Sequence, residues 1–60
     1  MTSKDLIKLL KDNGCTFVRH GKGDHQVWYS PITGKKFPIA HPKKQIPIGT
    51  LKSIKRMAGI

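Results

Sequence analysis

Two histidines that bracket a short glycine-containing segment are the residues of this sequence best suited to chemistry. His20 and His25 enclose Gly21-Lys22-Gly23-Asp24, which gathers two imidazoles, one ammonium group and several backbone amides. Breaking an RNA strand requires a base for the 2′-hydroxyl proton, a proton donor for the leaving oxygen and cations beside the phosphate. Because an imidazole exchanges protons near neutral pH, the segment is compatible with RNA cleavage. The alternative interpretation of His25 is an ordinary surface histidine.

Metal binding is the main competing use of histidine, and the sequence does not favour it. The only cysteine is Cys15, and no compact group of cysteine, histidine and carboxylate side chains supplies the ligands of a zinc site. No nucleophile motif surrounds Ser30, Ser53 or Cys15. We therefore expect no metal and no cofactor, and we expect Cys15 to be a small core residue.

Length and charge limit the class of protein. The 60 residues suffice for a single domain over residues 1–60, with little room for a deep substrate cavity. The 12 lysines and arginines outnumber 3 acidic residues, and the resulting formal charge of +9 is typical of a protein that binds a polyanion. No apolar run could span a membrane and no signal peptide is visible, so we expect a cytoplasmic protein.

The first half of the chain predicts a helix followed by a hairpin. Leucines recur at helical spacing over residues 3–13, and Gly14 suits a left-handed helix end. Strands are indicated at 16–20 and 25–30, where β-branched and aromatic residues are frequent, and Gly21–Asp24 connects them.

The second half predicts one more strand and a final helix. Residues 36–40 form the strand, and Pro38 indicates an edge position because proline cannot donate to a strand ladder. A polar link over 41–45 precedes a helix that begins near Pro47 or Thr50 and ends at Gly59. The apolar face expected for this helix consists of Ile48, Leu51, Ile54 and Ala58.

These elements define an α+β protein with the order α-β-β-β-α. A three-stranded antiparallel sheet buries most apolar surface when both helices cover one face and the other face stays open, the layout of double-stranded RNA-binding domains. Strand alternation places His25, Val27 and Tyr29 on one face and Gln26 with Trp28 on the other, so at least one of Trp28 and Tyr29 belongs to the core.

A series of short motifs runs through nearly the whole chain. The first half contains Lys4-x-Leu6-Ile7-Lys8-Leu9-Leu10, then Gly14-x-x-Phe17-Val18-Arg19, then Gly21-Lys22-Gly23-Asp24-His25-Gln26-Val27-Trp28. The second half contains Pro38-Ile39-Ala40-His41, then Ile46-Pro47-x-Gly49-Thr50-Leu51-x-x-Ile54, then Met57-Ala58-Gly59-Ile60. In order, spacing and total length, these motifs resemble the HicA toxins of bacterial toxin-antitoxin pairs.

The resemblance implies a metal-independent endoribonuclease that cleaves mRNA and arrests translation. It also implies a HicB-like antitoxin as protein partner. We expect the free toxin to be monomeric. The catalytic histidine of the family closes the glycine-containing loop, a position held here by His25. The family often has serine before this histidine, whereas this chain has Asp24, a carboxylate that could orient the imidazole but would also repel phosphate.

Contacts to RNA are expected from the loop and from scattered lysines. Lys22 is the candidate for a direct phosphate contact, assisted by the amides of the loop around Gly23. The candidates for a diffuse electrostatic footprint are Lys35, Lys36, Lys43 and Lys44. His41 is expected to be structural. Two non-catalytic alternatives remain open: an RNA- or DNA-binding module of the same fold, and a small ribosome-associated structural protein.

Overall fold

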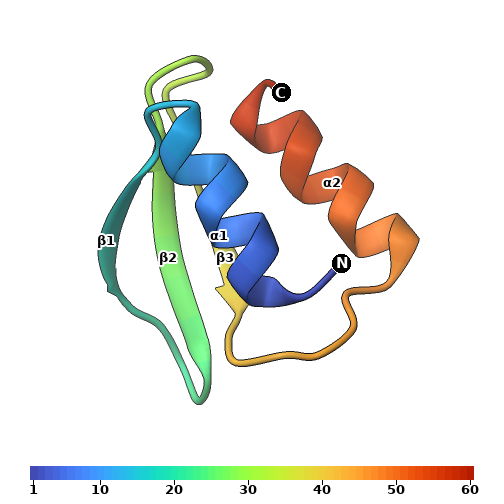
Figure 1. Ribbon diagram of the computed structural model, residues 1–60. Helices are drawn as coiled ribbons and strands as arrows, with labels where there is room; N and C mark the ends of the chain where they lie inside the picture. Colours follow the sequence, from blue (N-terminus) through green and yellow to red (C-terminus); the bar gives the residue numbers. More distant parts are fainter.

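The computed structural model describes residues 1–60 and shows a helix, three strands and a second helix (Figure 1). The elements are α1 (Ser3–Asp12), β1 (Thr16–His20), β2 (His25–Ser30), β3 (Lys35–Ala40) and α2 (Ile48–Ala58). The predicted α-β-β-β-α order is confirmed. The end of α1 and the start of β3 each differ from the predicted bound by a single residue.

Local capping explains where the helices begin and end. The hydroxyl oxygen of Thr2 accepts a hydrogen bond from the Asp5 amide at 3.1 Å, which satisfies a free N–H group in the first turn of α1. Gly59 ends α2 in the left-handed conformation with φ of 80°, and its amide donates to the carbonyls of Lys55 and Arg56.

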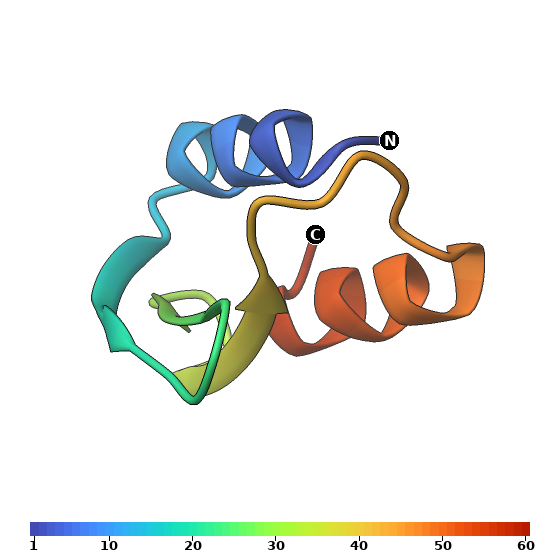
Figure 2. The ribbon, with the colours of Figure 1, turned by 90° about the horizontal axis from the view of Figure 1, so that it is seen from below.

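The sheet is antiparallel throughout, with β2 between β1 and β3. Both helices lie on the same side of the sheet, so its other face is open, as Figures 1 and 2 show together. Pro38 occupies the edge strand β3, which confirms its predicted position. Neither helix is long and apolar enough to cross a membrane.

The core fills the space between the sheet and the helices. Trp28 pairs with Phe37 across β2 and β3, and both side chains are almost fully buried. The remaining buried apolar residues are Leu6, Leu10, Cys15, Ile39, Ile46, Ile54 and Ala58. The core positions predicted for Cys15 and for one member of the Trp28–Tyr29 pair are therefore confirmed.

The prediction that Ile48 belongs to the core is wrong. Ile48 is 69% exposed, whereas Ile46, two residues earlier in the link, is 3% exposed. Ile48 is the first residue of α2 and precedes the turn that packs on the sheet. The backbone amide of Ile46 donates to the Met1 carbonyl at 3.0 Å, which holds the link against the start of the chain and turns Ile46 inward.

The buried hydroxyl of Ser30 fastens the end of β2 to the end of α2. It donates to the Ala58 carbonyl at 2.6 Å and accepts from the Ile32 amide at 3.2 Å. Ser30→Ala removes the hydroxyl that bonds the Ala58 carbonyl and the Ile32 amide. Because Ser30 is fully buried, the free energy of unfolding should fall by about 1 to 3 kcal/mol. Chemical denaturation measures this loss, and Ser53→Ala, at an exposed position of α2, serves as the control.

Candidate functional site

A shallow hollow on the open face of the sheet contains the histidine singled out by the sequence. We call it the open-face hollow; its volume is about 410 Å³, and it is lined by Arg19, Gly21, Lys22, His25, Val27 and Pro38. His25 and Val27 come from β2, Pro38 from the neighbouring strand β3, and Arg19 from β1 on the other side. The hollow therefore crosses all three strands beside the β1–β2 loop.

The β1–β2 loop fixes the orientation of the His25 ring. The Gly21 amide donates to the His25 carbonyl at 2.7 Å, and the His25 amide donates to the Lys22 carbonyl at 3.2 Å. His25 Nδ1 lies 2.9 Å from the same Lys22 carbonyl oxygen. Because a carbonyl can only accept, Nδ1 carries a proton and donates, which leaves Nε2 of the neutral ring as a free proton acceptor. The loop thus orients the exposed imidazole so that Nε2 is able to accept a proton.

Glycine is favoured at both glycine positions of the loop, for different reasons. Gly23 has φ of 64°, a left-handed conformation that lets the chain reverse direction. A Cβ atom on Gly21 would lie 3.2 Å from the His25 Cβ and 3.5 Å from a Val27 methyl group. The close approach of the Gly21 backbone therefore helps to hold His25 in place.

Arg19 lines the open-face hollow, although no pattern in the sequence pointed to it. The register of β1 against β2 shifts between Phe17 and Arg19, so one extra residue, Val18, is accommodated in β1. Arg19 consequently pairs with Val27 on the open face. Regular alternation from Phe17 would have turned Arg19 toward the helices, and no turn residue in the strand signals the irregularity.

The same shift separates the two histidines of the loop. His20 pairs with Gln26, on the face that the helices cover, whereas His25 lies on the open face. His20 lines a different cavity from His25. His20 and His25, which enclose the same short loop, therefore do not form one site.

The candidate RNA-binding residues fall in three separate places. Lys22 and Gly23 belong to the His25 loop, and Lys22 lines the open-face hollow. Lys36 pairs with Tyr29 on the open face. It lies about 13 Å along β3 from Ala40, the residue that pairs with His25. The other three lysines lie apart from His25: Lys35 at the start of β3, and Lys43 with Lys44 in the link, where they line a cavity with Ser3 and Lys4.

His41 is tied into the structure of the link. Its Nδ1 lies 2.7 Å from the Ser3 hydroxyl, and that hydroxyl also accepts from the Lys43 amide at 2.8 Å. Ser3 is 1% exposed, so this group of bonds anchors the link to the start of α1. The structural role predicted for His41 agrees with these contacts.

Residues that could hold a metal do not gather anywhere in the chain. No group of three or more histidine, cysteine, aspartate or glutamate side chains is arranged to bind an ion. Cys15 is a free, buried thiol.

The fold and the open-face hollow define a class: a small, strongly basic α+β protein that presents one oriented histidine and two cationic side chains on an open sheet. In a comparison with known protein families, residues 3–60 match the family described as HicA toxin of bacterial toxin-antitoxin. The chain belongs to the HicA toxin family, and its role is that of the toxin in a toxin-antitoxin pair. No curated protein and no solved structure gave a significant match.

Proposed function

We propose that this toxin is a metal-independent endoribonuclease that cleaves mRNA in the cytoplasm and arrests translation, with His25 as its catalytic residue. The observation that carries the proposal is the state of the His25 ring: Nδ1 donates to the Lys22 carbonyl, and Nε2 is left free beside two cationic side chains. A base directed at the open face, with cations around it, matches what cleavage at a phosphodiester requires.

The reaction begins with proton transfer to His25. Nε2 accepts the proton of the ribose 2′-hydroxyl while the 2′-oxygen attacks the adjacent phosphorus. The new P–O2′ bond forms as the P–O5′ bond breaks, which yields a 2′,3′-cyclic phosphate and a 5′-hydroxyl. Lys22 and Arg19 stabilise the negative charge that builds up on the phosphate oxygens.

The leaving 5′-oxygen needs a proton from a second group. His20 is a poor candidate because it lines a cavity on the opposite face of the sheet. Lys22 lies in the open-face hollow and can donate, either directly or through water. Asp24 immediately precedes His25, but as a carboxylate it accepts protons and repels phosphate, so we assign it no step.

Arg19 should matter for the rate of cleavage and not only for RNA affinity. Arg19→Ala removes a cation from the open-face hollow, and we expect kcat to fall by about 10²-fold, the cost of losing one group that stabilises transition-state charge. Arg56→Ala removes the same side chain from the exposed surface of α2 and should leave kcat unchanged. A loss confined to KM would show that Arg19 only binds RNA.

The antitoxin partner is proposed to be a HicB-like protein with an acidic surface. A formal charge of +9 and an open sheet face favour an acidic protein that covers the open-face hollow and blocks His25. Co-expression tests this part: a co-encoded neighbour that neither binds the toxin nor relieves growth arrest would contradict it.

The second candidate is a non-catalytic module that binds RNA or DNA through the same basic surface. The charge alone favours it, since binding to nucleic acid requires little more than clustered cations. Incubation of RNA with purified protein separates the candidates, because a module binds RNA without shortening it. A ribosome-associated structural protein would instead sediment with ribosomes and cause no growth arrest.

A further inference from the structure

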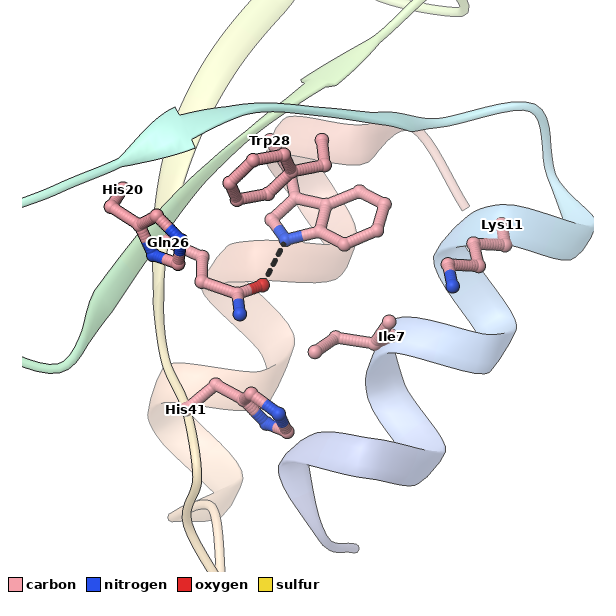
Figure 3. Close-up of a pocket in the computed structure, with 7 residues that line it drawn as sticks. Ile7, Lys11, His20, Gln26, Trp28 and His41 are labelled. Atoms are coloured by element: carbon pink, nitrogen blue, oxygen red, sulfur yellow. Dashed lines mark hydrogen bonds between the residues drawn. The ribbon is translucent and has the colours of Figure 1, made fainter.

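A second cavity lies on the helix-covered side of the sheet, between α1 and the first two strands (Figure 3). We call it the helix-side cavity; its volume is about 350 Å³, within the range of small-ligand sites. It is lined by Ile7, Lys11, Phe17, His20, Gln26, Trp28 and His41. None of these residues belongs to the open-face hollow.

Gln26 presents an unbonded NH₂ group to this cavity. Its Oε1 accepts from the Trp28 indole Nε1 at 3.0 Å, drawn as the dashed line in Figure 3. An indole N–H can only donate, so this bond fixes which end of the amide faces Trp28. The NH₂ group of Gln26 is left over, and Figure 3 shows it on the side of the amide that faces His41.

His41 is also fixed as a donor. The Ser3 hydroxyl accepts from the Lys43 amide, and the only acceptor within reach of its own hydrogen is His41 Nδ1. Because Ser3 is almost fully buried, its O–H donates to Nδ1. The proton of the neutral His41 ring therefore resides on Nε2, which remains available to donate to a ligand.

A cation and an exposed aromatic pair complete the cavity. The Lys11 side chain extends from α1 toward the cavity in Figure 3. Phe17 is 45% exposed, and its ring packs edge-on against His20 with centroids 5.2 Å apart. Three donor groups, one of them charged, thus stand beside an exposed aromatic surface. This combination suits a ligand that joins an anion to a flat ring.

We propose that the helix-side cavity binds one nucleotide of the RNA strand, its phosphate on Lys11, Gln26 and His41 and its base against Phe17 and His20. The proposal rests on the proposed function, since it makes the same RNA strand the ligand. An acidic peptide would use the donors but not the exposed aromatic rings, so the combination favours a nucleotide.

The position of the cavity relative to His25 supports one continuous RNA path. Gln26 follows His25 directly in β2, and the two side chains point to opposite faces of the sheet. A strand that passes around the β1–β2 loop, which carries Lys22, can therefore reach both places. The helix-side cavity would hold the RNA while the open-face hollow acts on a neighbouring linkage.

The test uses Trp28, the single tryptophan, as a built-in reporter. Its indole N–H is bonded to Gln26, so the NMR resonance of this group should shift when a ligand occupies the cavity. Uridine 5′-monophosphate should produce a saturable shift, and uridine or inorganic phosphate alone a much weaker one. Lys11→Ala should raise the Kd for the nucleotide about tenfold, the cost of one charge-assisted contact.

Lys8→Ala is the matched control, because it removes the same charge from an exposed position of α1 that lines none of the cavities. It should leave the Kd unchanged. With single-stranded RNA, Lys11→Ala should also reduce the slope of log affinity against log salt by about 0.7, the loss of one phosphate contact.

Three results would overturn the proposal. They are no saturable indole shift with the nucleotide, equal weakening by Lys8→Ala and Lys11→Ala, and tighter occupancy by an acidic peptide than by the nucleotide. The last result would make the cavity a protein-binding site. The titration needs no cleavage, so its outcome is independent of nuclease activity: intact RNA with a saturable shift would remove the proposed nuclease and leave this nucleotide site standing.

Discussion

His25→Ala should lower the single-turnover rate of RNA cleavage by about 10²- to 10⁴-fold while leaving the fold intact. The loss is expected because Nε2 of His25 is the free proton acceptor of the open-face hollow, held in position by the bond from Nδ1 to the Lys22 carbonyl. The side chain is exposed and outside the buried core, so its removal leaves no cavity. Rapid mixing of excess protein with end-labelled RNA measures the rate.

Two control measurements accompany this experiment. RNA affinity of His25→Ala should stay close to that of the wild type, since the lysines and arginines that give the formal charge of +9 all remain. Lys8→Ala, away from the open-face hollow, should cleave at the wild-type rate. A His25→Ala protein that folds, binds RNA and still cleaves at the wild-type rate would assign the chemistry to another residue.

Leu10→Ala should remove a large part of the protein's total stability. Leu10 is 0% exposed and belongs to the single buried cluster, so truncation should cost about 2 to 5 kcal/mol through lost burial and the cavity left behind. A domain of 60 residues has a total stability of about 3 to 9 kcal/mol. Thermal unfolding followed by circular dichroism measures the effect.

Leu9→Ala provides the comparison for Leu10→Ala. Leu9 is the neighbouring leucine on α1, half-buried and outside the cluster, so the same truncation should cost far less. Equal costs for the two variants would mean that Leu9 is as deeply buried as Leu10, so that α1 is rotated about its axis.

The elements of this fold could be predicted because several local signals agree along the chain. Leucine spacing, Gly14 and Gly59 mark the helices, and β-branched and aromatic residues mark the strands. The α-β-β-β-α order follows from these signals, and burial of apolar area then favours both helices on one face. Pro38 further predicts that its strand lies at an edge of the sheet, because proline has no N–H to donate inside a sheet.

The composition of the two cavities could not be predicted, because it depends on a single irregularity in β1. The register shift at Val18 moves Arg19 to the open face and His20 to the helix side. A bulge changes the face of every later residue in a strand, yet nothing about the residues Phe17-Val18-Arg19 distinguishes it from regular pairing. The sequence thus predicted the neighbourhood of His25 and Lys22 but not the arginine beside them.

Tertiary contacts explain the incorrect assignment in α2. Apolar periodicity favours Ile48 as a core residue, but it cannot show that the link is held to the Met1 carbonyl through the Ile46 amide. That contact joins parts of the chain that are far apart in sequence. It directs Ile46 into the core and leaves Ile48 exposed at the start of α2.

Catalysis by His25 without metal can be tested in a time course of RNA integrity with purified toxin in excess EDTA, run beside folded His25→Ala. We expect the wild-type protein to shorten the RNA progressively, to leave 2′,3′-cyclic phosphate ends, and to retain this activity when divalent ions are chelated. His25→Ala should leave the RNA intact. Wild-type protein that binds RNA and leaves it intact throughout would contradict the nuclease and support a non-catalytic RNA-binding module instead.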